Sequence, residues 1–568
     1  MKFNYLYRIR FLSFVVFSFA LLLIGRLYFL QVIDSEKYTN KADRQYQSTS
    51  KNVFDRGTIF FQNKDGSLVS AATLRSGFIV AVNPEILKDP ESVWSKVNEI
   101  MPTDHDEFIA KATKTKDPYE EIAVHVDTDI GKQIGDLKIP GLQVYKDRWR
   151  FYPGGNTAAH VVGILGFKGD EYAGRYGLER QYDAQLERGE GAYVNFFAQI
   201  FSDIRDVAKN TDDIESDIVT TIEPTVQSYL QNVIASTTEK WSSDLTGGII
   251  MDPLTGEIFA MESYPTFDPN NSSEVKDAKI FSNPLVENIY ELGSIIKVLT
   301  MASGIDAGVV NAGSTYYDKG FVMINNKKVS NFDGKERGVV SMQDVLSQSL
   351  NVGSAHVQSL LGNERFSKYF YNFGLGNKTN IELPNEAKNL VTSLDSKVNI
   401  DLASASFGQS LALTPISAIS ALSVVANGGF IINPHLVKSI KYKVGVTKNT
   451  PITLGKQVIK RETSEEVSRM MVYSMDNVLM NGTLKLARHS VAVKTGTAQV
   501  ARPGGAGYYE DRVLHSFVGF FPAYNPKFII LLYTVNPKGI RFGSETLSIP
   551  FSEITKFLIN YYEVPPDR

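Results

Sequence analysis

The sequence predicts an α+β protein with a single N-terminal transmembrane helix, and three features of the 568-residue chain lead to that prediction. Residues 11–33 form an apolar stretch, residues 34–215 consist mainly of short β-like runs, and residues 216–568 have strand-like runs on both sides of helical ones. Strands at both ends of a domain with helices between them indicate an α+β sheet closed by its terminal strands. The chain is too long for one hydrophobic core, so several domains are expected.

The apolar stretch at residues 11–33 is predicted to anchor the chain in a membrane, because about 20 apolar residues in a helix cross a bilayer core. Three basic residues precede it: Lys2, Arg8 and Arg10. They place a short tail, residues 1–10, in the cytoplasm and the bulk of the chain outside. A cleaved signal peptide is the alternative, but the stretch is long for one and no A-x-A-like site follows it.

Composition excludes several kinds of function. The formal net charge is −3 and no long basic run occurs, so nothing in the charge pattern indicates nucleic acid as a partner. Cysteine is absent, which excludes disulfides, thiolate metal sites and a cysteine nucleophile.

The two regions beyond the anchor differ in pattern. Residues 34–215 contain β-like runs, such as 78–82 and 141–145, with few long helical patterns and nothing that looks catalytic. A polar stretch at 209–217 marks the expected boundary. The elements predicted after it are a helix at 225–241, a hairpin of 247–251 and 257–261, a long apolar helix after Gly293, and three terminal strands at 490–501, 515–521 and 527–535.

Ser294 and Lys297 form a Ser-x-x-Lys element directly after Gly293. Residues three apart share a helix face, so the amine of the lysine can lie against the hydroxyl. Serine needs a base to take its proton, and an apolar setting can lower the pKa of a lysine enough to make it that base. The element alone is weak evidence, because Ser273 and Lys276 have the same spacing in a polar stretch.

Ser349 and Asn351 form a second element, Ser-Leu-Asn, just before a helical stretch at 352–361. A second hydroxyl can relay a proton, and an amide can hold both a lysine and a substrate carbonyl. Taken alone, such residues more often cap a helix.

Lys494, Thr495, Gly496 and Thr497 form a third element within a strand-like run. An ammonium and two hydroxyls on a strand edge can bind a carboxylate, and glycine leaves room for a substrate backbone to approach. For the lysine alone, a solvated side chain on an edge strand is the alternative.

Together, and in this order, the three elements match the set found in penicillin-binding proteins and serine β-lactamases. The chain resembles a class B penicillin-binding protein over nearly its whole length, which implies an elongated β-rich pedestal at 34–215 and a transpeptidase domain at 216–568. Further stretches similar to the family are Arg56-Gly57, Arg150-Phe-Tyr-Pro153, Gly177-Leu-Glu179, Asp252-Pro-Leu-Thr-Gly256 and Ser516-Phe-Val-Gly-Phe-Phe-Pro522, and departures from the family pattern occur at Leu292, Leu350, Ser410 and Val493.

The resemblance implies a peptidoglycan D,D-transpeptidase. Ser294 would attack the carbonyl between the last two D-alanines of a stem peptide and Lys297 would accept its proton, although the base is disputed in this superfamily. Ser349 would pass a proton to the leaving D-alanine, and Asn351 would orient the lysine and the donor's amide. No metal or organic cofactor is implied.

The resemblance also implies roles for the residues of the third element. Lys494, Thr495 and Thr497 would hold the terminal carboxylate, and the backbone N–H groups of Ser294 and Thr497 would stabilise the oxyanion. β-Lactams would acylate the same serine, because they present the same carbonyl and carboxylate.

The implied setting is the bacterial inner membrane, with the catalytic domain outside the cytoplasm and lipid II-derived glycan as substrate. The pedestal resembles one that docks a SEDS-family glycosyltransferase of the FtsW/RodA type. Glu291 and the compact N-terminal region favour a division-type over an elongation-type enzyme. Two rival functions stay open: a β-lactamase or β-lactam sensor, for which no class A-type Glu-x-x-Leu-Asn element is present, and a noncatalytic scaffold.

Overall fold

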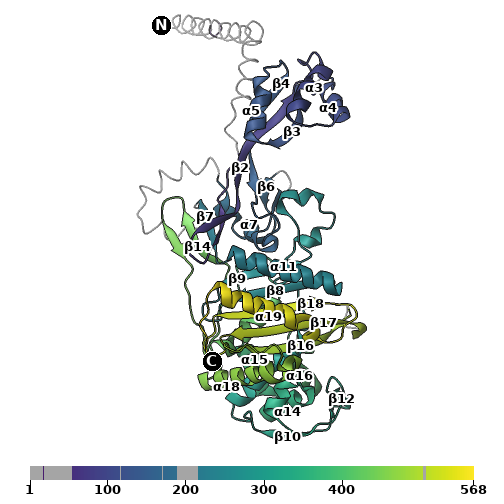
Figure 1. Ribbon diagram of the computed structural model, residues 1–568, viewed down its shortest axis with the longest axis vertical. Coiled ribbons are helices and arrows are strands. Elements are labelled where there is room, and N and C mark those ends of the chain that lie inside the picture. Colours follow the sequence, from purple (N-terminus) through teal and green to yellow (C-terminus); the bar gives the residue numbers. More distant parts are fainter. Residues whose placement is uncertain are drawn as a thin grey trace, which may run out of the picture. The chain divides into compact units, whose positions relative to one another are not determined.

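A computed structural model describes residues 17, 19 and 54–568, except 116, 169–170, 189–214 and 503–506. The tail predicted at residues 1–10 and nearly all of the anchor predicted at 11–33 lie outside the described residues. Within the described part of the chain, no helix combines the length and the apolar character needed to cross a membrane. The chain divides into two compact units, a smaller one that includes residues 74–149 and a larger one made of residues 56–73 and 150–568 (Figure 1).

The smaller unit combines an antiparallel sheet with three helices. The second half of β2 (Leu68–Val82) pairs with β3 (Glu120–Val126) and β4 (Leu142–Phe151). The helices are α3 (Pro90–Ile100), α4 (His105–Ala112) and α5 (Thr128–Asp136), and the shared core includes Val80, Val97, Phe108 and Ile134. The sequence showed few long helical patterns here, and these helices of 8 to 11 residues are too short to give a clear period.

The larger unit begins with a sheet built from distant parts of the chain. β1 (Ile59–Gln62) pairs antiparallel with the first half of β2 and parallel with β7 (Ser216–Thr220), and β14 (Val437–Tyr442) joins β7 and carries β15 (Thr447–Asn449). Beside it lie short elements, α6 (Ala159–Val162), β5 (Leu165–Lys168), β6 (Glu171–Gly174), α7 (Gly177–Gln181) and α8 (Asp183–Leu186). The predicted boundary between residues 215 and 216 stays a prediction, because residues 189–214 are not described.

A buried ion network stabilises this region. The carboxylate of Glu179 accepts hydrogen bonds from Arg56 Nε at 2.7 Å and from Arg150 Nε at 2.6 Å. Arg56 also pairs with Asp183 at 2.8 Å, and Arg150 donates to the carbonyl of Gly57 at 2.7 Å. Buried charges are tolerated only when they are paired. The network therefore gives a physical reason for three of the stretches that carried the family resemblance.

The second part of the larger unit is a five-stranded antiparallel sheet in the order β16-β17-β18-β8-β9. Its strands are β16 (Ala492–Ala501), β17 (Tyr508–Phe521), β18 (Phe528–Val535), β8 (Leu245–Met251) and β9 (Ile258–Tyr264). The hairpin from the start of this region thus pairs with the last strand, Ile250 opposite Ile530. The sheet predicted to combine strands from both ends of the domain is confirmed, and β16 forms one of its edges.

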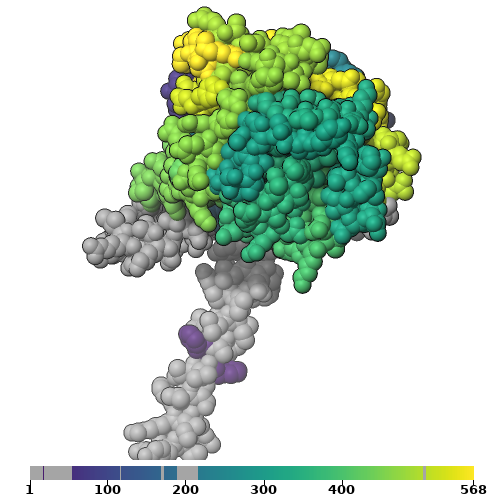
Figure 2. Space-filling model, turned by 90° about the horizontal axis from the view of Figure 1, so that it is seen from below, coloured from purple at the N-terminus to yellow at the C-terminus, as the bar shows by residue number. Residues whose placement is uncertain are grey.

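Helices cover both faces of this sheet. α11 (Pro224–Trp241) and α19 (Gly543–Tyr561) bury Leu230 and Phe551 against Phe517 and Ile530 on one face. The helical part on the other face appears in teal and green in Figure 2. It contains α12 (Lys297–Asp306), α13 (Met342–Ser347), α14 (Asn351–Leu361), α15 (Asn363–Asn372), α16 (Asn399–Ala405), α17 (Pro415–Ala426) and α18 (Arg461–Tyr473), with the ribbons β10 (Thr315–Asp318)–β13 (Gly338–Ser341) and β11 (Phe321–Ile324)–β12 (Lys327–Ser330).

Candidate active site

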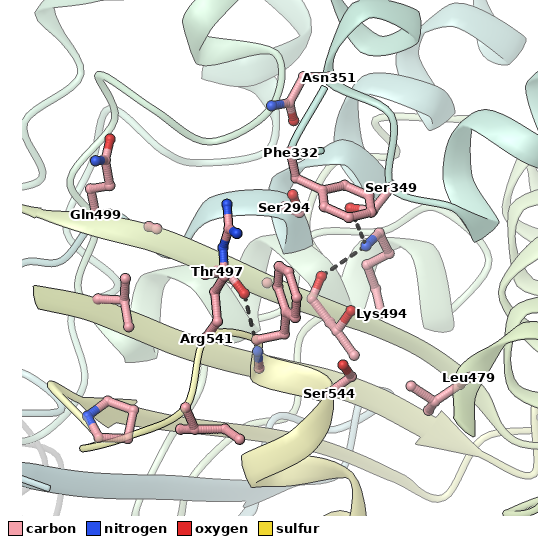
Figure 3. A pocket seen from close by; sticks show the side chains of 18 of the residues that line it. Ser294, Phe332, Ser349, Asn351, Leu479, Lys494, Thr497, Gln499, Arg541 and Ser544 are labelled. Carbon is pink, nitrogen blue, oxygen red and sulfur yellow. Dashed lines mark hydrogen bonds between the residues drawn. The ribbon is translucent and has the colours of Figure 1, made fainter. Parts of the chain in front are cut away.

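The three sequence elements meet at one cavity of about 1090 Å³ between the edge strand β16 and the helical part (Figure 3). Seven of the eight predicted residues line it: Ser294, Ser349, Asn351, Lys494, Thr495, Gly496 and Thr497. Lys297, the eighth, is only 1% exposed and lies behind this wall, where it contacts Ser349 and Asn351.

Ser294 lies in a tight turn that is fixed from both sides. Gly293 has a φ of +64°, and Ser294 continues in a 3₁₀ turn, Gly293–Ile296, that leads directly into α12. Side chains three apart are nearly eclipsed in such a turn, which brings position 297 under position 294. Within the described part of the chain, the Ser294 hydroxyl makes no hydrogen bond. Catalytic hydrogen bonds often form fully only when substrate is bound.

Lys297 is held by acceptors from the second element. Its Nζ donates to the backbone carbonyl of Ser349 at 2.5 Å and to Asn351 Oδ1 at 2.7 Å, and lies 3.2 Å from Ser349 Oγ. Burial, reinforced by the nearby charge of Lys494, holds the pKa of Lys297 well below its ordinary value. A neutral amine has two hydrogens and one lone pair. Because the two carbonyl oxygens take the hydrogens, the lone pair is left to accept a hydroxyl proton.

Ser349 has the left-handed backbone conformation, with a φ of +58°, in the turn between α13 and α14. This conformation costs an L-residue roughly 1–2 kcal/mol, and such strain is concentrated at functional sites. Helix capping does not explain the residue, because Leu350 is the N-cap of α14 and makes no side-chain capping bond. The hydroxyl of Ser349 instead lies between two amines, those of Lys297 and Lys494.

Asn351 is oriented by a bond on its far side. Its Nδ2 donates to the carbonyl of Ser330 on β12 at 2.9 Å, so its Oδ1 must face Lys297. One amide hydrogen remains for a substrate carbonyl.

Lys494 is not the solvated lysine of an ordinary edge strand. It is 3% exposed, and its Nζ donates to Ser349 Oγ at 2.9 Å and to the carbonyl of Thr495 at 2.8 Å. Burial lowers the pKa of Lys494 to about 7. The amine thus points at the hydroxyl of Ser349. Because its pKa is lowered, it is only partly charged near neutral pH.

Gly496 has a packing reason in addition to the one that the sequence suggested. A Cβ at this position would lie 2.2 Å from Ser516 Oγ and 2.6 Å from the carbonyl oxygen of Leu292, both closer than real contacts. Ser516 Oγ itself donates to that carbonyl at 2.6 Å. The missing side chain thus lets β16 pack against the segment that enters the turn of Ser294.

Sequence reasoning missed four residues of the site. Ser516 holds the Leu292 carbonyl, Gly543 N donates to Thr497 Oγ1 at 3.1 Å, and Phe332 and Arg541 line the cavity. Only Ser516 lies in a stretch that carried the resemblance. The remaining three come from a loop and a helix start, where no spacing rule signals proximity to a site.

Two protein-family models match the chain and together cover most of it. One, described as the penicillin binding protein transpeptidase domain, matches residues 246–556, and one described as the penicillin-binding protein dimerisation domain matches residues 53–196. The chain belongs to the class B penicillin-binding proteins. The two matches locate the family's two parts in this penicillin-binding protein, and the first contains every predicted site residue.

Named relatives match this class B penicillin-binding protein over most of its length. Stage V sporulation protein D of Bacillus subtilis is 30% identical over 565 residues, which cover 96% of this chain and 84% of that protein. Peptidoglycan D,D-transpeptidase FtsI of Escherichia coli is 24% identical over 586 residues, 98% and 93% of the two chains. The crystal structure of penicillin binding protein 3 from Mycobacterium tuberculosis, complexed with aztreonam, has the same fold, with a TM-score of 0.68, 22% identity and coverage of 91% and 98%.

The departures from the family pattern are accommodated locally. Ser410 stands where the family usually has glycine, and it adopts a φ of +63° while its N–H donates to Glu291 at 3.1 Å. Leu292 stands in place of proline with a φ of −85°, close to the angle that proline imposes. Both substitutions therefore keep the backbone path into the turn of Ser294.

Proposed function

We propose that this class B penicillin-binding protein is a peptidoglycan D,D-transpeptidase that cross-links stem peptides through an acyl-enzyme on Ser294. One observation carries the proposal: Ser349 and Lys494 line the cavity beside Ser294, and the amines of Lys297 and Lys494 both lie within 3.2 Å of the Ser349 hydroxyl. Nucleophile and base thus come from one sequence element, the proton relay from a second, and the lysine proposed to hold the carboxylate from a third. The relatives named D,D-transpeptidase support this reaction class.

In the first half-reaction, Ser294 Oγ attacks the carbonyl carbon between the last two D-alanines of the donor. The hydroxyl proton passes to neutral Lys297, whose lone pair is available because its hydrogens are bonded elsewhere. As the C–O bond forms and the C–N bond breaks, the leaving D-alanine nitrogen takes a proton from Ser349, which Lys297 replaces. Asn351 keeps the lysine in position throughout.

The backbone N–H groups of Ser294 and Thr497 would donate to the carbonyl oxygen as it gains charge. The close packing at Gly496 supports this assignment, because a Cβ there would lie 3.3 Å from the nitrogen of Ser294. Strand β16 therefore runs directly beside the N–H of the nucleophile, and Thr497 is the next residue along it.

The donor would bind along β16, which as an edge strand can take up an extended peptide. Thr495 and Thr497, with Lys494, would hold its terminal carboxylate. In the second half-reaction an acceptor amine attacks the ester carbonyl, the new C–N bond releases Ser294 Oγ, and the amine proton returns through Lys297. β-Lactams would stop the cycle at the acyl-enzyme, in line with the aztreonam complex of the solved relative.

The cellular setting is also proposed. Residues 11–33 would anchor the protein in the bacterial inner membrane, with residues 34–215 as a pedestal for a SEDS-family glycosyltransferase that polymerises lipid II-derived glycan. By the family resemblance, Glu291 before Ser294 and the compact N-terminal region support a division-type enzyme. The carboxylate of Glu291 accepts hydrogen bonds from Tyr508 at 3.0 Å and from the N–H of Ser410. An elongation-type role remains the alternative.

The decisive experiment is labelling of the purified protein with a fluorescent penicillin. Ser294→Ala should abolish the label, whereas Ser273→Ala, which alters the second Ser-x-x-Lys sequence, should leave it unchanged. Equal labelling of wild type and Ser294→Ala would refute the proposal. The lifetime of the adduct separates the classes, since minutes to hours suits a transpeptidase and seconds a hydrolase. Cross-linking that survives Ser294→Ala in cells would indicate a scaffold instead.

A further inference from the structure

Arg541 presents an uncompensated positive charge to the active-site cavity. It lies in the loop between β18 and α19, lines the cavity, and has an exposed side chain. Within the described part of the chain its guanidinium makes no hydrogen bond or ion pair, and it lies over the ring of Phe542, 5.3 Å from its centre. Arginine carries a planar fork of donors that matches a carboxylate in two places, so this group is suited to bind one.

The backbone around Arg541 is fixed by the strands of the active site. The carbonyl of Arg541 accepts a hydrogen bond from His515 Nε2 at 3.0 Å, and two residues later Gly543 N donates to Thr497 Oγ1 at 3.1 Å. His515 is fully buried, and burial lowers its pKa to about 4, so it stays neutral and keeps this bond near neutral pH. The base of the Arg541 side chain is therefore held in place relative to β16 and β17.

Four further cations line the cavity, and three of them are already paired or hydrogen-bonded. Lys494 is buried and directed at Ser349. Arg337 is bonded to Asp333 at 3.0 Å and to Gln348 at 2.9 Å. Lys538 lies 3.8 Å from Asp244. Arg512 is exposed and, like Arg541, lies over an aromatic ring without an ion pair among the described residues. Of these two guanidinium groups, that of Arg541 belongs to the loop that leads to Gly543, whose N–H is bonded to Thr497 of the site.

The side of the cavity on which Arg541 lies indicates which anion of the donor peptide it would meet. In Figure 3 Arg541 and Gln499 lie on one side of Ser294, while Ser349 and Lys494 lie on the opposite side. If the donor's terminal carboxylate binds on the Lys494 side, as proposed above, the residues before the scissile bond extend toward Gln499 along β16. An anion next to Arg541 then belongs to that upstream part of the donor.

We propose that Arg541 is a specificity-determining residue that binds a side-chain carboxylate on the donor stem peptide, upstream of the scissile bond. The inference rests on the proposed transpeptidase function. It identifies the preferred substrates as stem peptides whose diamino acid carries a free carboxylate, rather than peptides in which that group is amidated or missing.

The test compares two synthetic pentapeptide donors that differ only in this group, free carboxylate or amide, with full-length protein in detergent. Arg541→Gln should lower kcat/KM for the carboxylate donor about ten-fold, the scale of one charge-assisted hydrogen bond at a partly exposed site. It should change kcat/KM for the amidated donor less than two-fold. Arg541→Lys should recover part of the loss, because it restores the charge without the fork.

Two controls make the result specific. Arg469→Gln removes the same charge from an exposed arginine on α18 that is paired with Glu466, and it should affect neither donor. Acylation by benzylpenicillin, which has a terminal carboxylate but none upstream, should be unchanged in Arg541→Gln. An equal loss with both donors, a loss with benzylpenicillin, or no loss at all would each overturn the inference. Turnover of neither donor by wild type would defeat the proposed function itself, and the inference with it.

Discussion

Replacing Gly496 with alanine tests whether this glycine serves packing or substrate access. The new Cβ would lie 2.2 Å from Ser516 Oγ and 2.6 Å from the Leu292 carbonyl oxygen, so both groups must move. Losing the Ser516–Leu292 hydrogen bond costs about 1 kcal/mol, and overpacking a close contact costs about 1–3 kcal/mol. We therefore expect the free energy of unfolding to fall by about 2–4 kcal/mol, measured by urea denaturation.

The same substitution should also damage the chemistry. Its Cβ would press on the nitrogen of Ser294, 3.3 Å away, and the loss of one well-placed oxyanion donor slows catalysis by about 100-fold or more. Acylation by benzylpenicillin, followed by stopped-flow fluorescence, should therefore slow by about 100-fold in Gly496→Ala.

A matched control is Gly135→Ala in α5, where a Cβ would meet only Val144 at 3.9 Å. Alanine there should be neutral or slightly stabilising, because it favours the helix. Unchanged stability and unchanged benzylpenicillin acylation in Gly496→Ala, with only KM for stem peptide raised, would refute the packing argument. That outcome would restore the view that this glycine makes room for substrate.

Two further predictions concern the polar groups of the site. Because the pKa of Lys494 is lowered to about 7, the unfolded chain binds a proton that the folded chain lacks between about pH 7 and the ordinary value of 10.5. The contribution of this lysine to the free energy of unfolding therefore rises with pH in that window. Lys494→Met should reduce the slope of stability against pH by at most about 1.4 kcal/mol per pH unit in urea unfolding, and an unchanged slope would contradict the assignment. Ser349→Ala and Ser349→Gly should both slow acylation by about 10²–10⁴-fold. The glycine variant should be more stable than the alanine variant by about 1 kcal/mol, because glycine adopts a positive φ without steric cost. Equal stability of the two variants would argue against backbone strain at this position.

Much of the architecture could be predicted because local patterns specify it. The helix at 225–241, the hairpin of β8 and β9 and the three last strands follow from periodicity, and the structure confirms them, although β17 begins at Tyr508, seven residues before the start predicted at 515. The helices α3–α5 were missed because short helices give little periodicity. The return of β14 to the sheet of β1 and β7 could not be predicted, since no local rule pairs residues more than 200 positions apart.

The sequence by itself determined which chemical groups are present and in what order: two serines, two lysines, an amide and two threonines within three short elements. Tertiary structure decided what each group does. It buried Lys297 and Lys494 around the Ser349 hydroxyl and lowered the pKa of both, because burial disfavours charge. It assigned Gly496 to strand packing and placed Arg541 at the cavity. These outcomes depend on distances between remote segments, and only the folded chain fixes those distances.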